Sequence, residues 1–221
     1  IFLIIYNVVG KKLKNWVILL ASIIFYAWGA PKFVFILIGS TIIDFYLVRM
    51  MYNSKAISRK RALLIVSITL NLGLLAYFKY ANFFIENVNS FLHLMGINPI
   101  SWFNVLLPIG ISFYTFQTLT YSIDIYRNVH KPLDRVNDYL LYIMSFPQMI
   151  AGPIVRFNTI ADQIVERNET IDDKLTGFIR FSIGLAKKVL IANVMEEQAD
   201  LIMNSDISNI STAMAWTGIM A

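Results

Sequence analysis

Residues Ala62–Phe78 read ALLIVSITLNLGLLAYF and contain no Asp, Glu, Lys or Arg. A membrane-spanning helix needs about 20 mostly apolar residues, with a lower limit of about 17. Two similar runs precede this one, Asn15–Pro31 and Phe33–Met51, and the second carries Asp44 inside it and Arg49 near its end. These three runs predict helices that cross a membrane.

The composition of the whole chain agrees with this prediction. Hydrophobic residues make up 57% of the 221 residues and charged residues 15%, whereas charged residues make up about 25% of ordinary soluble domains. Mean hydropathy is +0.60. Because no Gly/Ser-rich or Pro-rich linker separates the apolar runs, we expect residues 1–221 to form a single membrane domain. The sequence has no cysteine, which excludes a disulfide framework and a thiolate nucleophile.

Basic residues cluster between the apolar runs. The clusters are Lys11–Lys14, Arg59–Arg61 and Arg127–Arg135, and two predicted spans separate each cluster from the next. All three clusters then lie on the same side of the membrane, as the positive-inside rule requires for cytoplasmic loops. The net charge of +5 is therefore attributed to membrane topology, and no nucleic-acid partner is expected.

The stretch Asn87–Ile123 has no charged residue but is too long for one straight span, and two prolines interrupt it. We expect a helix that ends at about Met95, a turn over Gly96–Pro99, and a span over Leu106–Tyr126. Further along, Leu175–Met195 is predicted to be a basic helix. Counted at 100° per residue, its cations fall within roughly 140° of one another, which suits a helix at the cytoplasmic interface. These cations are Lys174, Arg180, Lys187 and Lys188.

One apolar run contains residues that break helices. Tyr139–Val155 is free of charge but holds Pro147, Gly152 and Pro153, so a bent or re-entrant segment is expected. Irregular backbone at membrane depth is tolerated only where protein packs around it or where it lines a water-filled cavity. Gln148 and Arg156 flank this break. Arg156 could hold an anionic group or extend to the membrane surface from a helix end.

Isolated polar residues inside the spans are the other candidates for function. Gln117 lies in the middle of a predicted span and either joins helices or lines a polar tunnel. Asp44 is expected to pair with a lysine or arginine on another helix, and Asp124 with Arg127 in the next turn. The histidines, His93 and His130, are too isolated to predict a metal site.

Two segments resemble a known family. Leu107–Arg127 reads LPIGISFYTFQTLTYSIDIYR and Ser145–Phe157 reads SFPQMIAGPIVRF. Both resemble the membrane-bound O-acyltransferase family, in its branch of bacterial alginate O-acetyltransferase membrane subunits. Three weaker matches occur in the order of that family. They are FYAWGAPKF (Phe25–Phe33), YFKYANFF (Tyr77–Phe84) and GLAKKVLIAN (Gly184–Asn193), so the resemblance extends through nearly the whole chain.

The resemblance implies an all-helical, polytopic fold with a funnel through the bacterial cytoplasmic membrane. It implies transfer of an acyl group from a cytoplasmic donor, with acetyl-CoA expected, to an extracytoplasmic polysaccharide. No bound cofactor is expected. Accessory acetyltransferase proteins outside the membrane are expected as partners. The substrate path is predicted to involve Gln117, Gln148, Gly152, Pro153 and Arg156.

The resemblance also implies what these residues lack. The family's catalytic histidine belongs to a later segment, so we expect no catalytic residue within 1–221 and take the chain as the N-terminal part of a longer protein. Transfer of D-alanine to teichoic acid is the close alternative. A transporter or flippase is the alternative outside enzymes, because transporters also use broken helices with polar groups at mid-membrane.

Overall fold

The structure is a computed structural model that describes residues 1–149, 155–205 and 210–220. In those residues every regular element is a helix, which confirms the all-helical class. The chain divides into two compact units, residues 1–167 and 168–221, each described separately below. The prediction of a single membrane domain therefore remains a prediction.

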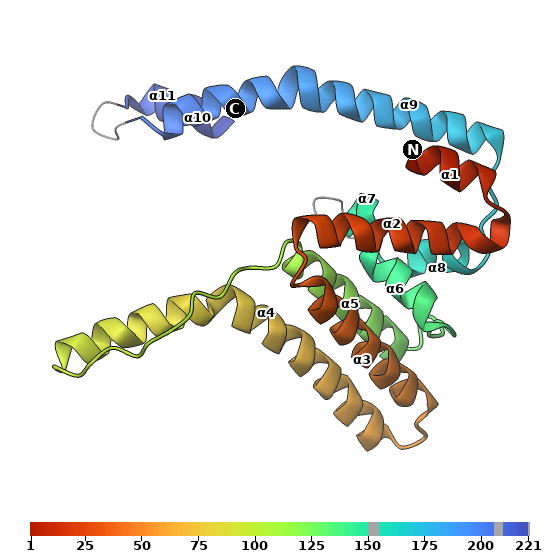
Figure 1. The fold of residues 1–221 in the computed structure, drawn as a ribbon, viewed down its shortest axis with the longest axis horizontal. Helices are drawn as coiled ribbons and strands as arrows, with labels where there is room; N and C mark the ends of the chain where they lie inside the picture. Colours follow the sequence, from red (N-terminus) through yellow and green to blue (C-terminus); the bar gives the residue numbers. More distant parts are fainter. Residues whose placement is uncertain (150–154, 206–209, 221) are drawn as a thin grey trace. The chain divides into compact units, whose positions relative to one another are not determined.

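The first unit is a bundle of helices (Figure 1). Within it α3, α4 and α5 pack side by side, and α6 packs against α2 and α3. Its longer helices are α2 (Lys14–Gly29), α3 (Val34–Asn53), α4 (Ile57–Leu94), α5 (Ile111–Tyr126) and α6 (Val136–Met144). Its short elements are α1 (Phe2–Val8), the 3-10 turn η1 (Lys11–Leu13), α7 (Phe146–Met149) and α8 (Phe157–Val165).

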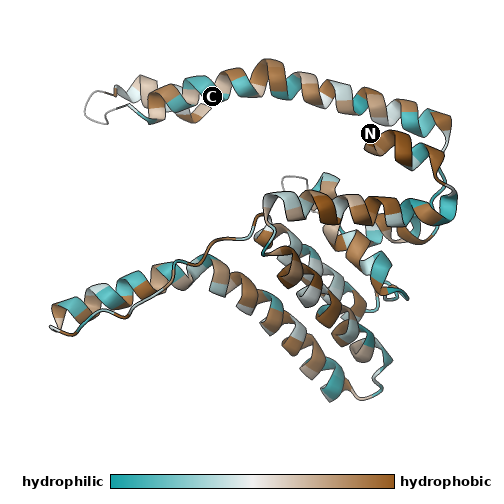
Figure 2. Ribbon diagram, viewed as in Figure 1, coloured by the Kyte–Doolittle hydropathy of each residue, from teal (hydrophilic) through white to brown (hydrophobic). Residues whose placement is uncertain are grey.

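The second unit is also helical in its described part. It begins with α9 (Ile171–Lys187), which continues without a break through a π-helical turn, η2 (Lys188–Ala192), into α10 (Asn193–Met203). The last helix, α11 (Thr212–Met220), packs against α10. The predicted basic helix is therefore longer at both ends than expected. Polar and apolar residues alternate along α9 (Figure 2), as in an amphipathic helix.

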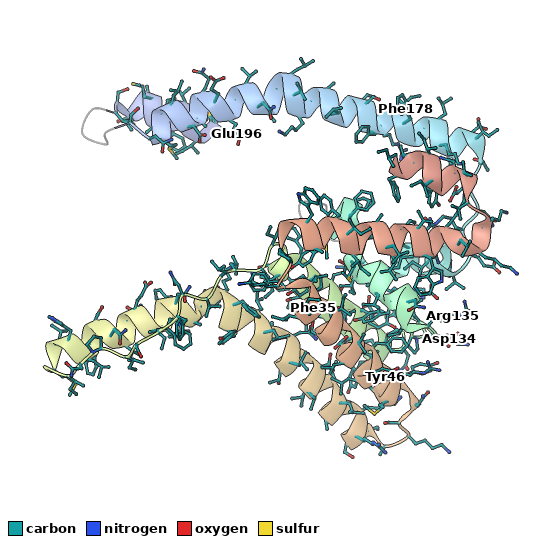
Figure 3. All side chains as sticks on the ribbon, in the orientation of Figure 1. Phe35, Tyr46, Asp134, Arg135, Phe178 and Glu196 are labelled. Atoms are coloured by element: carbon teal, nitrogen blue, oxygen red, sulfur yellow. The ribbon has the colours of Figure 1, made fainter. Side chains whose placement is uncertain are left out.

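Within the part of the chain that the structure describes, two helices are long and apolar enough to cross a membrane, namely α3 and α4. They differ in their surroundings, because 39% of the apolar window is buried in α3 and only 17% in α4. Even α3 presents exposed aromatic rings, Phe35 and Tyr46 (Figure 3). Large apolar side chains that face outward from a long helix are expected when lipid is the solvent.

The start of α5 departs from the sequence prediction, whereas the end of α4 agrees with it. Helix α4 ends at Leu94, and Gly96 turns the chain with φ of 71°, as predicted. The span expected from Leu106 becomes helical only at Ile111, because Pro108 and Gly110, which has φ of 75°, hold the preceding chain outside the helix.

Two asparagines of α4 hold the extended segment between α4 and α5 in place. Asn89 donates to the carbonyl of Ile100 at 3.1 Å and accepts from its N–H at 2.7 Å. Asn82 makes the same pair of bonds to Val105, at 2.8 Å and 2.9 Å. Side-chain amides thus supply the partners that an irregular backbone needs.

Candidate functional site

The helix break predicted near Pro147 lies between α6 and α7. Ser145 ends α6 with an extended backbone, φ −54° and ψ 111°. Pro147 then sits in the first turn of α7, where its missing N–H leaves no helical carbonyl without a partner. The N–H of Phe146, which would have bonded to Tyr142 in a continuous helix, donates instead to Ser22 Oγ of α2 at 3.1 Å.

The carbonyl of Tyr142 is therefore free of its helical partner, and two glutamines bind it. Gln117 Nε2 of α5 donates to this oxygen at 2.8 Å. Gln148 Nε2 of α7 donates to the same oxygen at 2.7 Å. Two of the predicted site residues, 31 positions apart in the sequence, thus converge on one backbone atom. Gln117 is buried, with 4% of its surface exposed, and it joins α5 to α6.

Four buried aromatic rings stand behind the break. Tyr121 lies with its ring centre 4.6 Å from that of Tyr139 and 4.7 Å from that of Phe157. Tyr142 packs edge-on against Phe157 at 5.4 Å, and its hydroxyl donates to the carbonyl of Val155 at 3.2 Å. The rings fix the far end of the broken segment, because Phe157 begins α8 and is 1% exposed.

Arg156 is the residue immediately before α8, and it is exposed while its neighbour Phe157 is buried. The structure therefore does not bring Arg156 into the glutamine cluster. Gly152 and Pro153, the remaining predicted residues of the substrate path, lie outside the described residues.

Asp44 forms a second polar centre, with partners that differ from those expected. Its carboxylate is fully buried in α3 and accepts hydrogen bonds from three neighbouring helices. Asn71 Nδ2 donates at 3.1 Å, Ser122 Oγ at 3.3 Å and Tyr139 Oη at 2.7 Å, and Ser67 Oγ donates as well. The prediction that Asp44 pairs with a lysine or arginine was wrong. Neutral donors replace that cation, because a carboxylate with several hydrogen bonds needs no counter-ion in contact.

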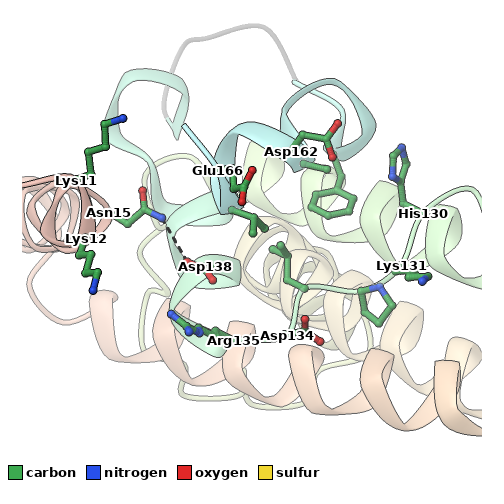
Figure 4. A pocket seen from close by; sticks show the side chains of 15 residues that line it. Lys11, Lys12, Asn15, His130, Lys131, Asp134, Arg135, Asp138, Asp162 and Glu166 are labelled. Carbon is green, nitrogen blue, oxygen red and sulfur yellow. Dashed lines mark hydrogen bonds between the residues drawn. The ribbon is translucent and has the colours of Figure 1, made fainter. Parts of the chain in front are cut away.

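A cavity of the first unit lies between the first and third basic clusters (Figure 4). It measures about 870 Å³ and is lined by Lys11, Lys12, Lys131 and Arg135 together with four acidic residues. Asp138, one of the four, accepts a hydrogen bond from Asn15 Nδ2 at 3.4 Å. Burial raises the pKa of the Asp138 carboxyl, and the Asn15 bond and the Arg135 charge oppose that shift. The mixed lining gives the cavity no strong preference for anions.

The histidines do not join the glutamine cluster. His130 lines the large cavity, with its ring centre 5.8 Å from that of Phe157. His93 lies exposed in the last turn of α4. Among the residues that the structure describes, no three His, Asp or Glu side chains gather as metal ligands. The expected Asp124–Arg127 ion pair is also missing from the described contacts, and Arg127 is exposed.

Sequence reasoning missed several residues of these two centres. Ser22 and the Tyr142 carbonyl carry no sequence signal of their role, because a backbone atom has no side-chain identity. Ser67 and Asn71 did leave a signal, since they lie one turn apart in an otherwise apolar helix. A polar pair on one face of a spanning helix predicts a polar partner across the bundle.

Comparison with known proteins gives close relatives along the whole chain. The chain is 37% identical over 223 residues to a probable alginate O-acetylase of Pseudomonas syringae and 35% identical over 223 residues to that of Pseudomonas aeruginosa. A peptidoglycan O-acetyltransferase of Helicobacter pylori is 31% identical over 230 residues, which cover 92% of this chain. The chain spans 42% of the length of each of these relatives.

No family model matches the sequence, and no solved structure matches it significantly. The relatives nevertheless agree with one another, since the alginate O-acetylases of two Pseudomonas species align with all of the chain. This similarity, together with the motifs at Leu107–Arg127 and Ser145–Phe157, makes the chain a member of the membrane-bound O-acyltransferase family, related to its alginate O-acetylases.

Proposed function

We propose that these residues form part of a membrane enzyme that O-acetylates an extracytoplasmic polysaccharide. The similarity to alginate O-acetylases along the entire chain carries this proposal. The peptidoglycan O-acetyltransferase among the relatives widens the class of acceptor to other polysaccharides. In both cases the acceptor group is a sugar hydroxyl, so the chemistry is the same.

The reaction sets requirements that the described residues meet only in part. The acceptor oxygen attacks the carbonyl carbon of the acyl donor, the bond to the leaving group breaks, and a base takes the hydroxyl proton. We propose acetyl-CoA as the donor, so the CoA thiolate leaves and takes the proton from the base, which gives the free thiol. We propose that the base is a histidine outside residues 1–221, as the family resemblance implies, and neither His93 nor His130 is proposed for this role.

The first unit is proposed to form part of a multi-pass domain in the bacterial cytoplasmic membrane. Its two long apolar helices, α3 and α4, support crossing of the bilayer. The break between α6 and α7 supports a re-entrant segment, because the freed backbone groups are bonded to side chains rather than left to lipid. Accessory acetyltransferase proteins outside the membrane are proposed partners that would carry or receive the acetyl group.

The broken segment is proposed to shape the path of acyl group or acceptor. Gln117 and Gln148 fix its first end through the Tyr142 carbonyl. Gly152 and Pro153 would let the chain approach the path closely, and Arg156 would hold an anionic group at the entrance. These roles follow from residue type and position, and each predicts a loss of transfer on substitution.

The full-length protein offers a direct test in cells that lack their own copy. Gly152→Leu should reduce the acetyl content of the polysaccharide, measured by proton NMR of the acetyl methyl group, to the level of the empty strain. Gly73→Leu is the matched control, because a Cβ atom added at Gly73 of α4 meets nothing within 4 Å. Normal acetylation by both Gly152→Leu and Arg156→Ala would contradict the proposed path.

A further inference from the structure

A cavity beneath α1 has the lining of a lipid site. It measures about 310 Å³ and lies between α1, α2 and the segment from α6 to α8, all within the first unit (Figure 1). We propose that it binds one acyl chain of an anionic phospholipid, with the phosphate at Arg167. This inference goes beyond acyl transfer and rests only on the membrane location of the first unit.

Most of the cavity wall is apolar and aromatic. The ring of Phe2 meets that of Phe146 edge-on at 5.1 Å, and Phe25, behind the lining, packs against Phe146 at 5.8 Å. Aliphatic and polar side chains also line the cavity, among them Ile18, Leu141, Ile160, Ser145, Gln148 and Gln163. A volume of about 310 Å³ is at the lower end of the range for ligand pockets, which suits one hydrocarbon chain rather than a whole lipid.

Two cations contact Tyr6, and one of them, Arg167, lines the cavity. Arg167, which is half-buried, donates from Nη1 to the hydroxyl of Tyr6 at 2.9 Å. Lys14 Nζ lies over the ring of the same tyrosine, 4.6 Å from its centre. The bond to Tyr6 fixes the Arg167 guanidinium, and a guanidinium has five N–H donors in a geometry that matches phosphate oxygens.

The outer face of α1 argues that the occupant comes from the bilayer. Phe2 and Tyr6 of α1 are half-buried and line the cavity, whereas Ile4 and Val8 are 69% and 82% exposed and do not line it. An exposed aliphatic face of this kind suits lipid and not water. The adjoining cluster Lys11–Lys14 is predicted to be cytoplasmic, and the cytoplasmic leaflet carries the anionic lipids. A phosphate at Arg167 would lie at that surface, with its chain beneath α1.

Electron paramagnetic resonance of spin-labelled lipids tests the proposal. The purified full-length protein is reconstituted into phosphatidylcholine vesicles with trace phosphatidylglycerol or phosphatidylcholine, each labelled on the acyl chain. We expect the motionally restricted fraction to be about fivefold richer in phosphatidylglycerol, from the interaction of one basic residue with an anionic lipid. Equal restriction of the two lipids would overturn the proposal.

Variants assign the restricted lipid to this cavity. Arg167→Gln should remove the preference for phosphatidylglycerol, and Arg167→Lys should keep most of it. Ile160→Trp fills the cavity and should reduce the restricted fraction of phosphatidylglycerol. Arg59→Gln is the matched control, since Arg59 is an exposed cation outside this cavity, and it should change nothing.

Two further outcomes would contradict the inference. An unchanged preference in Arg167→Gln would mean that surface charge alone attracts the lipid. Equal restriction of a labelled fatty acid and phosphatidylglycerol would mean that the phosphate is not recognised. Acetyl transfer is measured separately from lipid preference in the same variants. A variant that loses one property and keeps the other shows that the lipid site and the proposed enzyme activity are distinct.

Discussion

At the scale of single residues, Asp44 is a fully buried side chain that hydrogen bonds hold from several helices. A carboxylate buried in an apolar bundle is costly unless hydrogen bonds replace its water. Four donors on three helices do so here: Ser67 and Asn71 of α4, Ser122 of α5 and Tyr139 of α6. Asp44 therefore links α3 to α4, α5 and α6, and we expect the packing of these helices to depend on it.

Replacing Asp44 tests this dependence. Asp44→Leu removes the acceptor from four buried donors, and we expect a loss of about 2–5 kcal/mol in unfolding free energy. Asp44→Asn keeps one acceptor oxygen and should cost less. Thermal unfolding of the detergent-purified protein, followed by size-exclusion chromatography, measures both. Ser40→Ala is the control on α3, because Ser40 bonds to Leu37 in its own helix. A melting temperature of Asp44→Leu equal to that of Ser40→Ala would refute the role.

The glutamine pair predicts a different pattern of substitution. Because Gln117 and Gln148 donate to the same carbonyl, either single change to Leu leaves that carbonyl one partner. We expect each single variant to lose about 1 kcal/mol. The double variant leaves a buried acceptor unpaired and should lose more than the sum of the single changes. A double-mutant cycle of unfolding midpoints measures the excess, and strict additivity would show that the two amides act independently.

The sequence indicated which residues to examine at this scale but not what they would contact. Asp44 and Gln117 stand out because each is a polar group in an apolar run. Their partners come from segments up to 95 positions away, as with Tyr139 and Asp44. A single sequence contains no record of such contacts, and a carbonyl such as that of Tyr142 has no residue type to recognise.

At the scale of helices, residues such as Gly and Pro predicted where a helix ends better than the sequence predicted where a helix continues. Gly96 and Pro147 mark the turn and the break that the structure contains. Helix α4, expected as two segments, continues through Lys79 and Glu86. Helix α8 was not predicted, although Phe157, Ala161 and Ile164 have helical spacing and are buried. Its polar residues made the stretch look like a loop.

The start of α9 gives a prediction that involves pH. Thr170 and Asp173 form a capping box, in which Thr170 Oγ1 accepts from the N–H of Asp173 at 3.1 Å and Asp173 accepts from the N–H of Thr170 at 3.0 Å. Hydrogen bonds from Thr170 lower the pKa of the Asp173 carboxyl. The stabilising effect is therefore present above the ordinary aspartate pKa of about 3.9 and is lost as pH falls through the lower, folded value.

Circular dichroism of a peptide spanning residues 168–187 measures this effect. Helix content should fall as the solution is acidified below about pH 4, because protonated Asp173 accepts from Thr170 less strongly. Thr170→Ala should lower helix content at neutral pH and reduce the acid-dependent fall. Asp173→Asn removes the charge of the capping residue, and Asp172→Asn is the control that removes a neighbouring charge. If both variants lower helix content equally, the helix dipole and not the cap is responsible.

At the scale of the whole molecule, the structure gives information on how the basic loops lie relative to one another. It does not give the side of the membrane on which they lie. Lys12 and Lys131 line one cavity, so the first and third clusters share one end of the first unit. Arg49, near the end of α3, donates to the carbonyl of Asp134 in the third cluster at 2.8 Å. Charge counting predicts that all three clusters lie on one side, and the packing supports this for the first and third clusters.

Cysteine labelling in intact cells decides which side that is. Residues 1–221 contain no cysteine, so each single-cysteine variant reports one position once any cysteine elsewhere in the full-length protein has been replaced. Lys12→Cys, Lys60→Cys and Lys131→Cys should resist an impermeant thiol reagent until the cells are permeabilised, because positive loops stay in the cytoplasm. Ser101→Cys, in the segment that follows α4, should react from outside. Labelling of all three basic positions from outside would invert the topology. Labelling of Lys12→Cys but not Lys131→Cys would contradict the packing itself, since both residues line one cavity.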